Sequence, residues 1–265
     1  MTEQVDRRPD PKPRLHPHLW QAYLWWDEWM QARKRHTLRK CSADRGKSNM
    51  DGLTEAAYLE HIETVLKDAE KAMYSYGKAL GPIWDWLTGI HGVGDHTAAK
   101  LLAQIDDPAK FETISKLWRF CGYAVIDGEI DKPTKGEVLC YNRRLKSELF
   151  LVAENFIRHQ TPVYAQVYYE EKGRQKGLHP NPVCTKCGGI ACQRGQSWVC
   201  PECKASGRSI NFTPAHLHAR ALRKMIKIFL GHLWLKWREY EGLPVSEPYA
   251  IAHMPEHTHM IEPEA

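Results

Sequence analysis

Four cysteines in the last third of the chain have the spacing of a metal site. Cys184 and Cys187 form one Cys-x-x-Cys pair, and Cys200 and Cys203 form a second pair after twelve intervening residues. A Cys-x-x-Cys turn directs two sulfur atoms to one point, so two such turns supply the four thiolates that a tetrahedral zinc ion takes. Two glycines after the first pair let the chain turn back under the metal. The pattern predicts a structural Zn2+ ion in a small ribbon, with no open position for catalysis.

Two other uses of paired cysteines are less consistent with this sequence. A redox dithiol needs no second matching pair, and a disulfide framework belongs to an oxidising compartment. The first fifteen residues are polar and rich in arginine and proline, with no apolar signal core. No run of 18 apolar residues is present, so we expect no membrane span. These features predict a cytoplasmic protein in which paired cysteines bind metal.

The rest of the chain must hold this ribbon, and its apolar residues recur every three to four positions. This periodicity predicts a mainly α fold, made of a helical hairpin and a helix-hairpin-helix domain with a small inserted β zinc ribbon. The expected parts are a disordered leader at 1–15, a helical hairpin at 16–82, a helix-hairpin-helix DNA-binding domain at 83–177, the ribbon at 178–212, the C-terminal basic helix of the main domain at 213–241 and a flexible tail at 242–265.

Local signals predict where individual helices begin and end. The first helix should start at residue 16 and end in the basic run at 33–35, before a polar loop at 42–49. Ser115 is the expected N-cap of a helix that ends at residue 121. The remaining helices are expected at 54–78, 142–159, 164–172 and 214–240.

The residues Ile-His-Gly-Val-Gly at 90–94 resemble the turn of a helix-hairpin-helix, with histidine where proline is commoner. That motif binds the sugar-phosphate backbone without reading bases. Gly92 and Gly94 would let the backbone approach a phosphate, next to the positive end of the following helix dipole. Thr97 belongs to the motif, and Lys100 would add a positive charge in that helix. An ordinary turn between two helices remains the alternative.

Basic residues gather in three segments although the formal net charge is only +5. Four thiolates and one zinc ion would lower it to about +3, so the distribution of charge has to support any nucleic-acid argument. The segments are 33–47, 132–146 and the last helix, which has six basic residues and no acid between 214 and 238. A solvated helix face is the alternative to an anionic partner. The expected phosphate contacts in the last two segments are Arg143, Arg144, Lys146, Arg220, Arg223, Lys224 and Lys227.

A longer stretch is similar to the C-terminal domain of IS110/IS116-type insertion-sequence transposases. The similarity runs from the turn at 90–94 to the Gly-Tyr turn at 122–123, and Tyr-Asn-Arg-Arg-Leu-Lys at 141–146 takes the place of a Gly-Asn-Arg-x-Leu-Arg-like element. The family's Pro-x-Tyr and Tyr-Tyr elements are matched at 162–164 and 168–169, and residues 218–225 resemble its final helix. The resemblance covers roughly 55–240, with the ribbon as an insertion, and implies that DNA is the partner.

The chain also departs from that family. Full-length members carry a RuvC-like domain with acidic metal ligands, whereas only about 80 residues precede the hairpin here and they are predicted to be helical. The family's serine nucleophile has no counterpart between 122 and 146, where Thr134 is the only hydroxyl besides two tyrosines. Mg2+ is therefore expected only if the chain is catalytic, and no catalytic residue is assigned.

The resemblance thus implies a DNA-binding protein related to transposases, without the RuvC-like domain. One alternative is a transposase or recombinase subunit that cleaves DNA only in a homo-oligomer or with a partner recombinase chain. A second alternative is a zinc-bearing protein-interaction module. RNA in place of DNA stays an open alternative. The protein is expected in the cytoplasm, either associated with the nucleoid or encoded by a phage or another mobile element.

Overall fold

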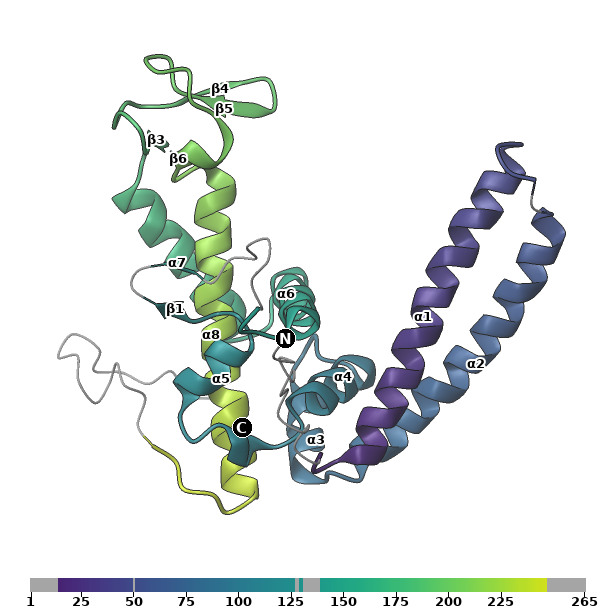
Figure 1. Ribbon diagram of the computed structural model, residues 1–265. Helices are drawn as coiled ribbons and strands as arrows, with labels where there is room; N and C mark the ends of the chain where they lie inside the picture. The colour runs from purple at the N-terminus through teal and green to yellow at the C-terminus, as the bar shows by residue number, and fades with distance from the viewer. Residues whose placement is uncertain (1–13, 50, 127–128, 131–138, 247–265) are drawn as a thin grey trace, which may run out of the picture. The chain divides into compact units, whose positions relative to one another are not determined.

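The computed structural model describes residues 14–49, 51–126, 129–130 and 139–246. Within these ranges the chain has eight α-helices and six strands of two or three residues, which confirms the mainly α fold (Figure 1). None of the helices in the described ranges has both the length and the apolar character needed to cross a membrane. The chain forms two compact units, one made of Met1–Trp84 with Asp95–Lys110 and the other of Asp85–Gly94 with Phe111–Ala265.

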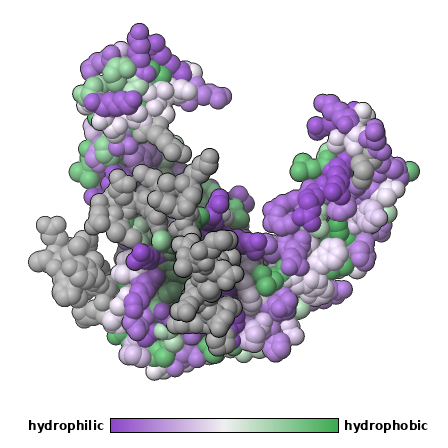
Figure 2. All heavy atoms as spheres, viewed as in Figure 1, coloured by the Kyte–Doolittle hydropathy of each residue, from purple (hydrophilic) through white to green (hydrophobic). Residues whose placement is uncertain are grey.

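The first unit is built on an antiparallel pair of long helices, α1 (Pro17–Asp44) and α2 (Gly52–Lys78) (Figure 1). Asp51 caps α2, because its carboxylate accepts hydrogen bonds from the amides of Leu53 and Thr54. A third helix, α4 (Asp95–Ile105), packs against both. The visible face of the helical pair is mostly hydrophilic (Figure 2), as expected when the apolar stripe of each helix faces its neighbours. That buried stripe consists of Leu19, Ala22, Tyr23, Trp26, Ile62, Leu66, Ala69 and Met73.

The predicted end of the first helix in the basic run at 33–35 was wrong, because α1 continues to Asp44. No glycine or proline interrupts this stretch before Gly46, which takes φ +64 in the left-handed region that ends helices. The basic run also has acidic partners within reach, since Arg33 pairs with Glu63 of α2 at 3.1 Å. The consecutive basic residues at 33–35 therefore did not end the helix.

A buried aspartate fixes the start of α1. Asp106 follows the last residue of α4 with φ +71, and its fully buried carboxylate accepts the amide of His16 at 3.0 Å and that of Leu15 at 3.3 Å. A carboxylate at a helix N-terminus accepts hydrogen bonds from amides that have no partner within the helix, and its negative charge interacts favourably with the positive end of the helix dipole. Leu15, which was predicted to belong to the disordered leader, is thus bound to the end of α4.

The second unit is organised around α8 (Pro214–Tyr240). Three helices pack against it, namely α5 (Ile114–Phe120), α6 (Arg143–Arg158) and α7 (Tyr164–Leu178). Its buried face includes Met225, Phe229, Leu233 and Trp237, and Phe156 of α6 stacks on Tyr164 of α7 beside Phe229. This cluster is the core that positions the basic residues of α6 and α8.

Two helix boundaries in this unit differ from prediction. Thr113, and not Ser115, precedes the first residue of α5, because Ile114 and Leu117 have to face the core. The helix expected to stop at residue 172 continues to Leu178 despite two glycines, since Gln175 is buried and donates to Glu171. Tertiary contacts thus overrode local propensity at both places.

The segment between the helices of the predicted hairpin is short. Helix α3 (Pro82–Gly89) and the turn at 90–94 precede α4, and the division between the two units falls within this segment. After α5 the chain contains β1 (Val125–Ile126) and β2 (Glu129–Ile130), which pair antiparallel. Residues 131–138, with Lys132, Thr134 and Lys135, lie outside the described residues, as do most of the predicted leader and the tail from 247.

Close packing at Gly77 generates a test of the first unit. A Cβ atom added at this buried glycine of α2 would overlap the indole ring of Trp84. We expect Gly77→Ala to lower the free energy of unfolding by about 1–3 kcal/mol, the usual cost of overpacking a core. Chemical denaturation followed by circular dichroism measures this, with the exposed neighbour Ser75→Ala as the control. Equal stability of the two variants would contradict the packing described here.

His96 of α4 generates a pH-dependent prediction. Its ring packs edge-on against Trp26 with 4.7 Å between centroids, and burial, together with the Lys100 ammonium, lowers the pKa of His96 to about 4. The unfolded imidazole has a pKa of about 6.5, so the stabilisation from a neutral His96 is complete above that pH and is lost as pH falls toward 4.

We therefore expect the stability of this unit to fall between pH 7 and pH 4.5. The contribution of His96 is roughly 1–2 kcal/mol after allowance for solvent screening at the exposed edge of the ring. Comparison of thermal unfolding of the wild type and His96→Gln isolates it, because the variant should lack this part of the pH dependence. Parallel pH profiles for the two proteins would refute the assignment.

Candidate metal centre and nucleic-acid interface

The cysteine pairs lie in two similar turns of a small β region between α7 and α8. Strand β3 (Val183–Cys184) pairs with β6 (Ile210–Asn211), and β4 (Cys192–Arg194) forms a hairpin with β5 (Ser197–Val199). Each turn follows the end of a strand and is tightened by a residue with positive φ directly after the second cysteine, Gly188 at +77 and Lys204 at +57. Glycine adopts this conformation without strain, so the first turn explains why glycine follows the first pair.

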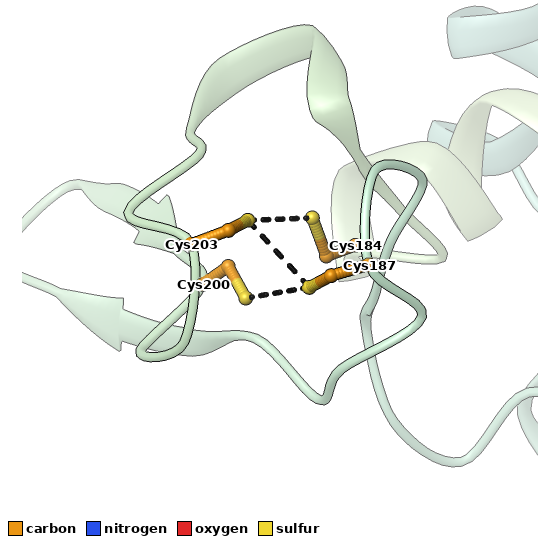
Figure 3. Close-up of side chains that lie close together, drawn as sticks. All are labelled: Cys184, Cys187, Cys200 and Cys203. Atoms are coloured by element: carbon orange, nitrogen blue, oxygen red, sulfur yellow. Dashed lines mark hydrogen bonds between the residues drawn. The ribbon is translucent and has the colours of Figure 1, made fainter.

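The four sulfur atoms converge on one point (Figure 3). All lie within 4.8 Å of one another, with Sγ–Sγ distances of 3.5 Å for Cys184–Cys203, 3.4 Å for Cys187–Cys200 and 3.5 Å for Cys187–Cys203. Tetrahedral zinc with bonds of about 2.3 Å places its sulfurs about 3.8 Å apart, whereas a disulfide needs about 2.05 Å. The four cysteines are therefore compatible with a metal ion such as zinc and not with a disulfide.

Backbone amides prepare the sulfurs for a cation. The N–H groups of Cys187 and Lys186 donate to Cys184 and lower the pKa of its thiol to about 7. The amide of Gly189 donates to Cys187, and the amide of Ala205 donates to Cys203. Such donors hold the ligands in place and favour thiolates, the form that binds metal, although hydrogen bonds among the neighbouring thiols raise the pKa of Cys187 and that of Cys203.

The apolar core of the ribbon is too small to fold it alone. Its fully buried members are two of the cysteines with Ala191 and Ile210, and Trp198 is only partly buried against them. A segment of this size needs a staple, and metal binding supplies about 10–16 kcal/mol in small zinc domains. At the base of the ribbon His179 stacks on Phe212 with 3.6 Å between ring centroids, which joins the incoming and outgoing chain.

The glycine turn has a packing role that the sequence did not reveal. Gly92 takes φ +94, and a Cβ there would lie 3.3 Å from Oγ1 of Thr161, which itself donates to the carbonyl of His91 at 2.7 Å. Gly92 is thus required by contact with the loop between α6 and α7. Gly94 is exposed, with open space around it.

The start of α4 offers less positive charge than expected. Lys100 is only 7% exposed, and its ammonium lies 5.2 Å above the ring of Trp26 inside the first unit. Thr97 is half-buried, and Asp95 places a carboxylate in the first turn of the helix. Burial beside Trp26 is thus unfavourable for the phosphate contact of Lys100, which stays a prediction.

Helix α6 begins with basic residues as predicted. The side chain of Asn142 caps it by accepting the amides of Arg144 and Leu145. Arg143 and Arg144 are exposed in the first turn, which contains no acid, and Lys146 lies 4.3 Å above the ring of Tyr141. Positive side chains thus add to the positive end of the helix dipole.

The basic face of α8 is partly neutralised, which corrects the expectation of six cations without compensation. Lys224 pairs with Glu171 of α7 at 3.0 Å, and Lys236 lies 3.6 Å from Glu239. Arg238 is buried and donates to the carbonyls of Phe111 and Pro244. The sequence alone did not show Glu171 to be a partner, because it lies 53 residues from Lys224.

Glu171 is the acid that holds this region together. It is buried and accepts hydrogen bonds from Arg174, Gln175 and Lys224. Burial opposes its charge, but these donors prevail and lower the pKa of Glu171 to about 2. The carboxylate therefore remains ionised at physiological pH.

Three cations remain on one side of α8, and we call them the basic stripe: Arg220, Arg223 and Lys227. Among the described residues no carboxylate forms an ion pair with any of them. Burial and the charge of Arg220 lower the pKa of Arg223, and burial and the charge of Arg223 lower the pKa of Lys227. The ammonium of Lys227 lies 3.9 Å above the ring of Trp118. An aromatic contact thus holds Lys227 in place, while the charges of the stripe repel one another.

The cysteine geometry generates a test of the metal centre. We expect the reduced, freshly purified chain to contain about one zinc ion and Cys187→Ser to lose it, because three thiolates no longer close the site. Cys192→Ser is the matched control, since Cys192 lies in the ribbon but outside the cluster and should leave the metal content unchanged. Inductively coupled plasma mass spectrometry measures the ratio, and a metal-free wild type would overturn the assignment.

Comparison with known proteins found one segment of the chain that is similar to a known family. Residues 85–169 match the family described as Transposase IS116/IS110/IS902. No curated protein matches the chain. The matched segment runs from α3 to the Tyr168-Tyr169 element of α7 and ends before the ribbon and α8. Residues 85–169 are thus similar to the IS116/IS110/IS902 transposase family, consistent with the C-terminal domain of such a transposase.

Proposed function

We propose that this chain is a nucleic-acid-binding protein with a transposase-related role, and that its second unit grips the phosphate backbone through the basic stripe of α8 and the start of α6. The stripe carries the proposal, because its cations repel one another and no described carboxylate pairs with them. The transposase-family segment at 85–169 makes DNA the first candidate partner.

A polyanion resolves the electrostatic conflict within the stripe. Phosphates placed beside Arg220, Arg223 and Lys227 would replace repulsion between cations by attraction. Binding of this kind also releases counterions from the nucleic acid, which makes affinity fall steeply with salt. Such contacts position a protein on the backbone and carry little sequence information.

The start of α6 adds a second set of donors. Arg143 and Arg144 stand at the positive end of a 16-residue helix whose first turn contains no acid. Helix N-termini of this kind bind phosphate through amides and dipole together. The turn at 90–94 contributes less to the proposal, because Lys100 is buried and Gly92 is occupied by packing, although Gly94 remains exposed.

The ribbon supports the same surface. The guanidinium of Arg220 lies 5.6 Å above the ring of Phe212, the residue that closes the base of the ribbon. Phe212 in turn donates its amide to His216 in the first turns of α8. Metal binding in the ribbon would therefore fix the end of α8 on which the stripe begins.

Neutralising the stripe tests the proposal. We expect Arg220→Gln, Arg223→Gln and Lys227→Gln each to weaken binding to duplex DNA and to reduce the slope of log Kd against log salt by about one, since each removes one phosphate contact. Fluorescence anisotropy over a salt series with the zinc-loaded full chain measures both quantities. Parallel series with single-stranded DNA and with RNA establish which nucleic acid is preferred.

Lys236→Gln is the matched control, because it removes the same charge from α8 at a residue that pairs with Glu239. It should leave both Kd and salt slope nearly unchanged. If the three stripe variants behave like Lys236→Gln, the stripe is a solvated helix face and the proposal fails.

A further inference from the structure

A groove between α6 and α8 has features that phosphate binding alone does not require. Its volume is about 470 Å³, within the usual range of small-ligand sites. The lining includes Tyr123, Lys146, Phe150, Leu222, Arg223 and Ile226. All of these residues belong to the second unit.

One wall of the groove is apolar and open to solvent. Phe150 is 47% exposed and its neighbour Leu151 is 54% exposed, both on α6. Large apolar side chains that remain exposed beside a hollow usually mark a binding surface. Leu222 and Ile226 of α8 line the facing wall.

The groove is also positively charged. Lys146 enters it from α6 and Arg223 from α8, and none of the described residues that line it is acidic. The ammonium of Lys146 is held 4.3 Å above Tyr141 and 5.9 Å above Tyr123, so aromatic rings fix its position. Arg223 belongs to the basic stripe as well, which makes the groove continuous with the proposed phosphate-binding surface.

We propose that this groove binds one unpaired nucleotide, with the base against Phe150 and Leu151 and its phosphate between Lys146 and Arg223. The inference rests on the proposed function and names the form of nucleic acid that the chain prefers. A base within a duplex is stacked between its neighbours and paired with the opposite strand, so it does not reach such a groove. A base in a single strand or at a junction can reach it. Aromatic stacking with backbone cations is the general mode of single-strand binding.

Phe150→Ala tests the groove. Loss of one stacked base should weaken the affinity for a single-stranded oligonucleotide about 5- to 150-fold and leave duplex affinity within about twofold. The probe is an oligonucleotide with one 2-aminopurine, whose fluorescence should be quenched by the wild type and not by Phe150→Ala. Deoxyribose and ribose versions of the probe distinguish DNA from RNA as the source of the nucleotide.

Tyr240→Ala is the matched control, since Tyr240 is an exposed aromatic residue of α8 outside the groove. It should bind single strands like the wild type, and thermal unfolding should show both variants to be folded. If the protein binds duplex DNA but Phe150→Ala and Tyr240→Ala have equal affinity for single strands, the groove assignment is overturned and the proposed function is not. If the protein binds no nucleic acid, the proposed function itself is overturned. If an acidic peptide of equal charge displaces the probe, the groove binds a protein partner instead.

Discussion

Helix α8 has to bury a continuous apolar face while it carries six basic residues, and the arrangement of the second unit follows from that constraint. Phe229, Leu233 and Trp237 turn inward against the neighbouring helices. A buried charge without a partner is costly, so exposed Lys224 pairs with the buried carboxylate of Glu171, and two carbonyls accept hydrogen bonds from buried Arg238. The cations that receive no carboxylate among the described residues are those of the stripe, of which Arg220 and Lys227 lie over aromatic rings. Burial of the apolar face of α8 therefore determines both the packing of this unit and the position of the proposed binding surface.

The four-cysteine cluster lies in the ribbon that leads into the start of the same helix. The ribbon between α7 and α8 has a very small apolar core, and a metal ion bound by Cys184, Cys187, Cys200 and Cys203 would stabilise it. A closed set of four thiolate ligands would leave no open position, so an ion bound there would have a structural role. Through Phe212 and His216 the ribbon continues into α8, so a folded ribbon gives that helix a fixed beginning.

Features with a local cause could be predicted from the sequence. The cysteine cluster depends on spacing, the bounds of α8 on Pro214 and the apolar period, and the start of α6 on the cap at Asn142. Features with a distant cause could not be predicted. The burial of Lys100 against Trp26 and the contact of Gly92 with Thr161 depend on residues about 70 positions away in the chain, which no local pattern encodes. The burial of Lys100 and the packing of Gly92 therefore favour α6 and α8 over the glycine turn as the proposed interface.

Chemical footprinting of basic side chains, with and without a bound oligonucleotide, tests the central claim most directly. Acetylation of lysines and phenylglyoxal modification of arginines, read out by mass spectrometry, report which side chains the nucleic acid covers. The account predicts protection of Arg143, Lys146, Arg220 and Lys227, and unchanged reactivity of Lys236 and of Lys34 on α1. Protection of Lys34 with none on the stripe would contradict it and move the interface to the first unit.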